Sequence, residues 1–138
     1  MKHLSSVRLS AAALLAAACI FSVACGYSAK TTPPVAGTVP TIAQLNPDSA
    51  TAGGAGFTLT VNGTNFGTKA VVNWNGAAQS GTRYVSGGQL TVAIPASMIE
   101  SAATVSVTVT NPGTAGTGIY GTGATLPETS TAMSFTIN

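Results

Sequence analysis

The side chains that carry most enzyme chemistry are scarce in this sequence. Its one histidine is His3, and its only acidic residues, Asp48, Glu100 and Glu128, fall in three different segments between expected strands. General acid-base or nucleophilic catalysis needs a base close to its partner, and no such pair is spaced for it here. A carbonyl-rich calcium site around Asp48 is an alternative, but a single carboxylate would make it weak. We therefore expect no catalytic residue, no metal site, no cofactor and no enzyme activity.

The first 24 residues have the pattern of an export signal. Lys2 and Arg8 give a positively charged start, and an apolar run of small residues follows from Leu9 to Ala24. This run is shorter than the roughly 20 apolar residues that a membrane-spanning helix needs, and it is typical of a signal peptide. A single N-terminal anchor helix is the alternative.

The end of this run resembles a bacterial lipobox, the signal after which a cysteine is lipidated. The resemblance rests on the residues from Ser22 to Gly26, with Cys25 as the expected site of lipid attachment. Ser22 departs from the aliphatic residue preferred there, and Ser22 and Ala24 also fit an ordinary signal-peptidase site. Cys19 is a weaker lipidation candidate. We expect an exported protein that is lipid-anchored to the bacterial cell envelope or, alternatively, secreted.

Removing the leader leaves a neutral chain. Lys30, Lys69 and Arg83 remain against the three acidic residues. Nucleic-acid binding depends on clustered basic side chains that neutralise phosphates, so no nucleic-acid partner is expected. No cysteine remains in the domain to form a disulfide, and its core alone must hold the fold.

Residues 25–40 are rich in Pro, Thr and Gly and predict a flexible tether, whereas residues 41–138 show a β pattern throughout. Apolar residues alternate with polar ones in short runs that are separated by turn residues. Asn75-Gly76 is the dipeptide that favours a type I′ hairpin turn. The expected strands cover about seven segments, at 41–46, 57–62, 70–75, 82–85, 90–94, 105–109 and 133–137.

This number and spacing of strands predict an all-β, immunoglobulin-like β-sandwich. One side chain in two along the runs should face a dry interior between the sheets. The expected inward set is Phe57, Leu59, Val61, Val72, Trp74, Leu90, Val92, Ile94, Val105, Val107, Val109, Met133, Phe135 and Ile137. We expect Trp74 to belong to this core because a lone Trp is usually largely buried. An exposed sugar-stacking platform is the alternative for this side chain.

The segment from Asn46 to Gly54, and above all Gly63-Thr64-Asn65-Phe66-Gly67, resembles the IPT/TIG family of immunoglobulin-like domains. The resemblance covers nearly all of residues 40–138 and implies an adhesion, ligand-binding or spacer module. Gly63 and Gly67 would permit a positive φ or a close approach at a strand exit, and Phe66 would plug the end of the core.

Two short motifs are set aside because their structural context is missing. Residues 116–121 spell the glycine pattern of dinucleotide-binding loops, but no helical pattern follows to hold a pyrophosphate. Residues 126–130 come close to a sortase sorting motif, yet a strand pattern follows instead of an apolar span.

The segment between Asn111 and Thr131 is far longer than the 2–5 residues of an ordinary hairpin loop. Ile119 and Tyr120 are its bulky pair, and long loops at a sandwich end commonly bind ligands. These two residues are the candidate ligand contacts, and an unstructured insertion is the alternative. The expected function is a non-catalytic binding or adhesion module for a glycan or a surface protein. The rival is a structural spacer or an envelope assembly subunit, and the expected lipid anchor would be the sole contact with the membrane.

Replacing Tyr120 with Ala tests the loop assignment. If the loop binds, Tyr120→Ala should weaken capture of glycans on an array, while the thermal unfolding midpoint stays within about 2 °C of the wild type because surface changes cost little. If the Tyr120→Ala variant captures glycans as well as the wild type does, the loop is not the binding site.

Overall fold

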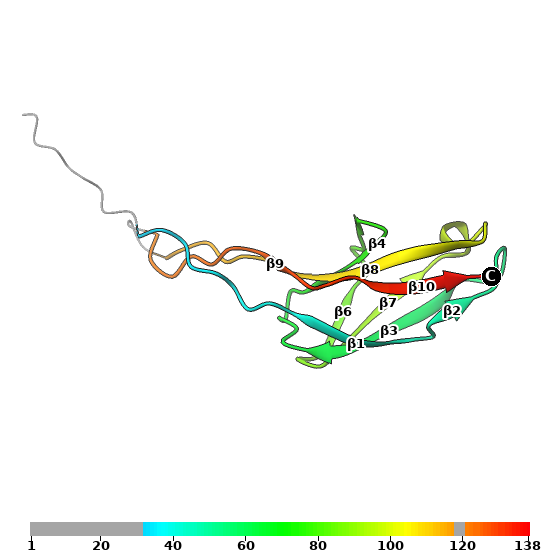
Figure 1. Ribbon diagram of the computed structural model, residues 1–138. Coiled ribbons are helices and arrows are strands. Elements are labelled where there is room, and N and C mark those ends of the chain that lie inside the picture. Colours follow the sequence, from blue (N-terminus) through cyan, green and yellow to red (C-terminus); the bar gives the residue numbers. More distant parts are fainter. Residues whose placement is uncertain (1–31, 118–120) are drawn as a thin grey trace, which may run out of the picture.

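The computed structural model describes residues 32–117 and 121–138. The expected leader, Cys25, Ile119 and Tyr120 lie outside the described residues. The described part is almost entirely β-structure, with one short 3₁₀ turn, η1 (Ala96–Met98), and it forms two facing sheets (Figure 1). The strands are β1 (Thr41–Asn46), β2 (Ser49–Ala50), β3 (Phe57–Thr64), β4 (Val71–Trp74), β5 (Ala77–Ala78), β6 (Arg83–Ser86), β7 (Gln89–Ile94), β8 (Ala103–Asn111), β9 (Glu128–Thr129) and β10 (Met133–Ile137).

One sheet has the order β1-β3-β7-β6, and the other has the order β2-β10-β8-β4-β5 with β9 paired to β8. All pairs are antiparallel except β2 with β10, which run parallel. Each of the seven predicted strands is present, and its ends lie within two residues of the expected ones. The structure adds three strands of two residues each, β2, β5 and β9. The predicted all-β, immunoglobulin-like sandwich is confirmed.

Alternation along the strands sends the predicted side chains into the space between the sheets. In the first sheet Leu59 lies opposite Val92, and in the second Val72 lies opposite Val109. All residues of the expected inward set are buried except Phe57 and Met133, which are half-buried and pack against the core. The core also contains residues outside that set: Ile42, Leu45, Phe66, Ala70 and Ile99.

Phe135 lies at the aromatic centre of this core. Its ring stacks on Phe57 from the opposite sheet at a centroid distance of 5.5 Å, and it meets Trp74 at 5.0 Å with a tilt of 56°. Tilted and offset aromatic pairs stabilise a core beyond the area that they bury. Trp74 is 5% exposed, so it is a core residue, and the sugar-platform alternative for it is wrong.

The turns follow the local sequence. Asn75 and Gly76 have φ values of 50° and 82°, as a type I′ turn between β4 and β5 requires. Gly63 serves as a point of close approach, since a Cβ there would overlap the Thr41 carbonyl oxygen and lie 2.6 Å from the Phe66 ring. In this segment the positive φ falls on Asn65, at 62°, and on neither glycine.

Phe66 closes one end of the core, as predicted. Its side chain is 4% exposed, and its backbone N–H donates to the Gly87 carbonyl oxygen at 2.9 Å. The sharp turn from Gly63 to Gly67 thus places an aromatic plug beneath the surface on which the candidate site lies.

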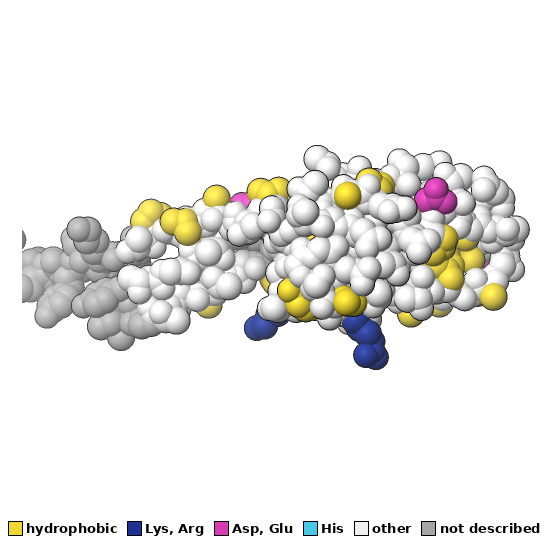
Figure 2. Space-filling view, turned by 90° about the horizontal axis from the view of Figure 1, so that it is seen from below, with side chains coloured by type: hydrophobic (Ala, Val, Ile, Leu, Met, Phe, Trp, Pro, Cys, Tyr) yellow, Lys and Arg dark blue, Asp and Glu magenta, His cyan; other side chains and the backbone are white. Residues whose placement is uncertain are grey.

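The charged side chains are few and lie on different sides. Figure 2 shows the basic side chains projecting from one long edge of the domain and acidic side chains near the opposite edge, with an uncharged surface between them. No helix of the described residues is long and apolar enough to cross a membrane.

The central position of Trp74 predicts a large effect of truncation. Trp74→Ala should lower the free energy of unfolding by roughly 3–5 kcal/mol, because it removes a buried aromatic and leaves a cavity against Phe135. Tyr84→Ala is the matched control, since Tyr84 is 40% exposed on β6, and its effect should stay near 0.5 kcal/mol. Urea unfolding followed by circular dichroism measures both, and a similar small loss for the two variants would contradict the packing described here.

Candidate functional site

The long segment between β8 and β10 is a paired β-structure for much of its described length. Residues 111–117 and 121–131, here called the arm, extend from one end of the sandwich (Figure 1). Thr114 pairs with Thr125 and Thr117 with Thr122, both antiparallel. Backbone hydrogen bonds of 2.8–3.1 Å join the two pairs in both directions. This segment, whose Gly and Thr content predicted a loop, is therefore a narrow two-stranded ribbon. Its two strands lie within residues 111–117 and 121–131.

Hydroxyl groups add to this pairing. The Thr114 and Thr125 hydroxyls lie 2.9 Å apart, and those of Thr110 and Thr129 lie 2.8 Å apart at the base of the arm. Threonine favours extended backbone, and threonine pairs across strands stabilise a ribbon. Ser130 fixes the base, because its buried hydroxyl accepts a hydrogen bond from the Val109 backbone N–H at 3.0 Å.

Residues 32–39, here called the N-terminal segment, run along the arm (Figure 1). Val35 forms a parallel bridge to Thr125. The Val35 N–H donates to the Ala124 carbonyl oxygen at 3.0 Å, and the Val35 carbonyl oxygen accepts from the Leu126 N–H at 2.9 Å. Sequence analysis assigned these residues to the tether that precedes the domain, and the structure pairs part of that stretch with the arm.

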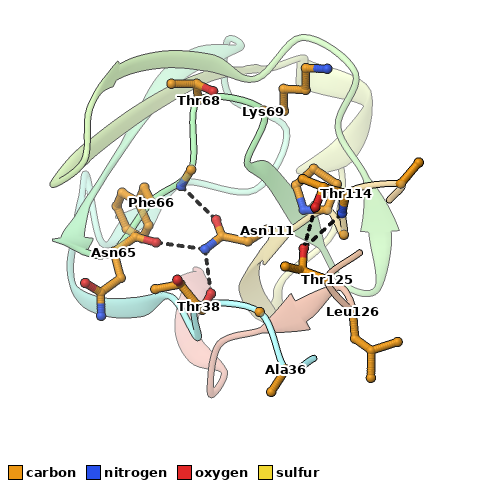
Figure 3. A pocket seen from close by; sticks show the side chains of 15 residues that line it. Ala36, Thr38, Asn65, Phe66, Thr68, Lys69, Asn111, Thr114, Thr125 and Leu126 are labelled. Carbon is orange, nitrogen blue, oxygen red and sulfur yellow. Dashed lines mark hydrogen bonds between the residues drawn. The ribbon is translucent and has the colours of Figure 1, made fainter. Parts of the chain in front are cut away.

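The side chain of Asn111 joins three parts of the chain at the base of the arm (Figure 3). Its Oδ1 accepts from the Gly67 N–H at 2.8 Å. Its Nδ2 donates to the Thr38 carbonyl oxygen at 2.7 Å and to the Asn65 carbonyl oxygen at 2.8 Å. Asn111 is 9% exposed. Its buried amide therefore makes its hydrogen bonds to the protein instead of to water.

A groove with a volume of about 690 Å³ lies above Asn111, between the arm, the N-terminal segment and the turn at Gly67. In Figure 3, Thr68 and Lys69 lie on one side of the groove, and Ala36 and Leu126 lie on the other. Among the described residues of the lining, Lys69 is the one ionisable side chain. The lining residues are Ala36, Gly37, Thr38, Asn65, Phe66, Gly67, Thr68, Lys69, Asn111, Pro112, Gly113, Thr114, Ala115, Thr125 and Leu126.

This lining can hold a ligand by hydrogen bonds and contacts with small side chains, and its described residues include no carboxylate or imidazole to act as a general base. Among the described residues no group of three His, Cys, Asp or Glu side chains could hold a metal ion. Asp48 precedes β2, Glu100 follows η1, and Glu128 is in β9. Asp48 and Glu100 thus lie between elements, as expected, whereas Glu128, which was also expected between strands, lies within a short strand.

A smaller hollow of about 390 Å³ lies at the other end of the core, beside η1. Its lining includes Gln79, Met98 and Glu100 together with Trp74. With 5% of its surface exposed, Trp74 cannot offer a ring face to a ligand, and the groove at the arm is the better candidate.

The N-terminal segment is held mainly through its backbone. Besides the bonds of Val35, Asn65 Nδ2 donates to the Val39 carbonyl oxygen at 3.4 Å. The Val35 and Val39 side chains are 59% and 51% exposed, so little apolar area is buried. Each hydrogen bond contributes about 0.5–1.5 kcal/mol, whereas ordering each residue costs about 1–2 kcal/mol. The segment is therefore weakly held.

The comparisons with known proteins agree with this architecture. A family model for the IPT/TIG domain matches residues 40–127. The chain belongs to this family of immunoglobulin-like domains, which is non-enzymatic. Searches of curated proteins and of solved structures found no match.

Sequence reasoning missed Asn111 and Thr38 as parts of one site. The match to the family begins at residue 40, so the pairing of the N-terminal segment lies outside it as well. Asn111 was considered only as the start of the long segment after the strand at 105–109, and nothing in the sequence around Pro112-Gly113 indicates its hydrogen bonds. The predicted sites Cys25, Ile119 and Tyr120 remain predictions.

Removing the Asn111 amide should destabilise the base of the arm. Asn111→Ala leaves the Gly67 N–H and two carbonyl oxygens without their partner, and the free energy of unfolding should fall by about 2–4 kcal/mol. Gln44→Ala on the exposed side of β1 is the control and should cost less than about 0.5 kcal/mol. Hydrogen exchange of the Gly67 N–H should also accelerate in Asn111→Ala and stay unchanged in Gln44→Ala. Equal stability of the two variants would show that the amide does not join these segments.

Proposed function

We propose that this chain is a non-catalytic binding or adhesion module of the bacterial cell surface. In this proposal the lipid on Cys25 holds the exported domain at the envelope, and the domain contacts a glycan or a surface protein. Membership of the IPT/TIG family supports a binding module in general. We place this contact in the groove beside Asn111.

The volume and lining of the groove are the observation that carries the proposal. Small-molecule and sugar-sized sites have volumes of about 300–1,000 Å³, and the groove measures about 690 Å³. Its threonine hydroxyls, amides and backbone groups are uncharged hydrogen-bonding partners. Such a lining suits a neutral glycan, whose hydroxyls both donate and accept, better than a strongly charged ligand.

The scarcity of catalytic groups supports a role without chemistry. The described residues of the lining contain one amine, on Lys69, and no carboxylate, imidazole or thiol. A bound sugar would meet no pair of acids like those that glycosidases place on either side of the scissile bond. Binding without turnover is the function that this arrangement supports.

Filling the groove tests the proposal. Thr68 is exposed and lines the groove, so Thr68→Tyr should occupy part of the volume and reduce binding of full-length protein to array glycans by at least tenfold. Thr136→Tyr is the control, because Thr136 is exposed on β10 and lines none of the hollows described here. Both variants should keep the wild-type thermal midpoint.

Two outcomes would count against the proposal. Wild-type affinity in Thr68→Tyr would exclude the groove as the glycan site. A wild-type protein that retains no glycan on the array would remove glycans as the ligand class.

A further inference from the structure

The contacts of the N-terminal segment do not depend on its side chains. Val35 uses its N–H and carbonyl groups against the arm, and Thr38 and Val39 each offer a carbonyl oxygen to an asparagine side chain. An extended strand from any chain could make the same four hydrogen bonds. The arm is in this sense a strand-addition site that the protein fills with its own residues.

One position makes the site selective. A Cβ at Gly37 would lie 2.5 Å from the Leu126 carbonyl oxygen and 3.1 Å from Cγ of Glu128. A strand that occupies the site must therefore carry glycine there to avoid displacing the backbone of the arm. A second copy of this chain supplies the identical sequence and meets that requirement.

The chain also has a suitable hinge. Pro40 is fully buried, whereas residues 32–39 are exposed except for Gly37, which is half-buried. The buried proline keeps the start of β1 in place while the weakly held segment before it can leave the arm. Exchange of such a terminal element between copies is a low-cost route to a dimer.

The edges of the four-stranded sheet are less suited to association. In the four-stranded sheet both edge strands are irregular, with register shifts between Ile42 and Gln44 in β1 and between Tyr84 and Ser86 in β6. Bulges and an edge charge such as Arg83 discourage pairing with another chain. Residues 124–126 of the arm, which pair with Val35, carry no charged side chain, and the acidic side chain of Glu128 lies further along this edge, near Gly37.

We propose that two copies of this chain associate by exchanging residues 32–39, so that the segment of each copy pairs with residues 124–126 of the other. Each exchanged segment remakes the contacts that it had within its own chain, including those to Asn111. The balance between monomer and dimer is therefore set by the concentration of the chain and by the hinge at Pro40. This proposal does not depend on glycan binding, and either one can fail alone.

Photo-cross-linking of the full-length chain in detergent tests the exchange. A benzophenone amino acid replaces Val35, whose side chain is exposed, and denaturing gels separate cross-links within a chain from those between chains. We expect a covalent dimer that grows with protein concentration, with position 35 joined to residues 124–126 by peptide mapping.

Two glycine variants carrying the same probe provide the matched comparison. Gly37→Val should reduce the dimer at least fivefold, because its side chain would collide with the Leu126 carbonyl. Gly81→Val should leave the dimer unchanged, since a Cβ at Gly81 meets nothing within 4 Å and its φ is not positive. Circular dichroism checks that both variants fold.

The proposal is overturned if position 35 cross-links to residues 124–126 within single chains at every concentration. It is also overturned if a covalent dimer forms to the same extent in both glycine variants, because that dimer would reflect chance contact in the micelle. Should Gly37→Val fail to fold, Asn111→Ala takes its place and should likewise reduce the dimer severalfold.

Discussion

The aromatic packing around Phe135 is the contact on which the rest of the domain depends. Phe57 reaches it from one sheet and Trp74 from the other, so this cluster helps to set the separation of the sheets. The described residues contain no cysteine and few charges, and hydrophobic burial must hold the fold. β8 connects this core to the groove. Its inward residues Val105, Val107 and Val109 are buried, and Asn111 continues the same alternation at the base of the arm.

The parts of the fold that follow a local rule could be predicted from the sequence. Side chains alternate across a strand, so a run such as Leu90, Val92 and Ile94 shows both the strand and its buried face. Ile42 and Leu45 break that rule, because a bulge between Ile42 and Gln44 turns two residues three positions apart toward the same core. Ile99 is buried beside a 3₁₀ turn, where no periodicity exists to reveal it.

The candidate site was beyond sequence reasoning because its contacts are distant along the chain. Asn111 lies 73 residues from Thr38 and 46 from Asn65, and no local pattern connects them. Gly, Thr and Pro in the arm favour a loop by composition, yet here threonine pairs and a glycine at a close approach build a ribbon. The segment from Gly63 to Gly67 was identified as a special turn, but its role in placing the Gly67 N–H against Asn111 required the structure.

The two proposals concern the same part of the molecule, and each therefore affects the other. The N-terminal segment and the arm lie at one end of the domain, and the C-terminus lies at the other (Figure 1). With attachment through Cys25, neighbouring copies would have their arms at the same distance from the surface, and confinement raises their effective concentration.

Gly37 and Thr38 line the groove and also belong to the segment that would exchange. A ligand in the groove would contact that segment and would bind the docked and released states unequally. Such a difference in affinity is what shifts a population between two states. Ligand binding and association through the arm would then be linked, with Asn111 at the point where both act.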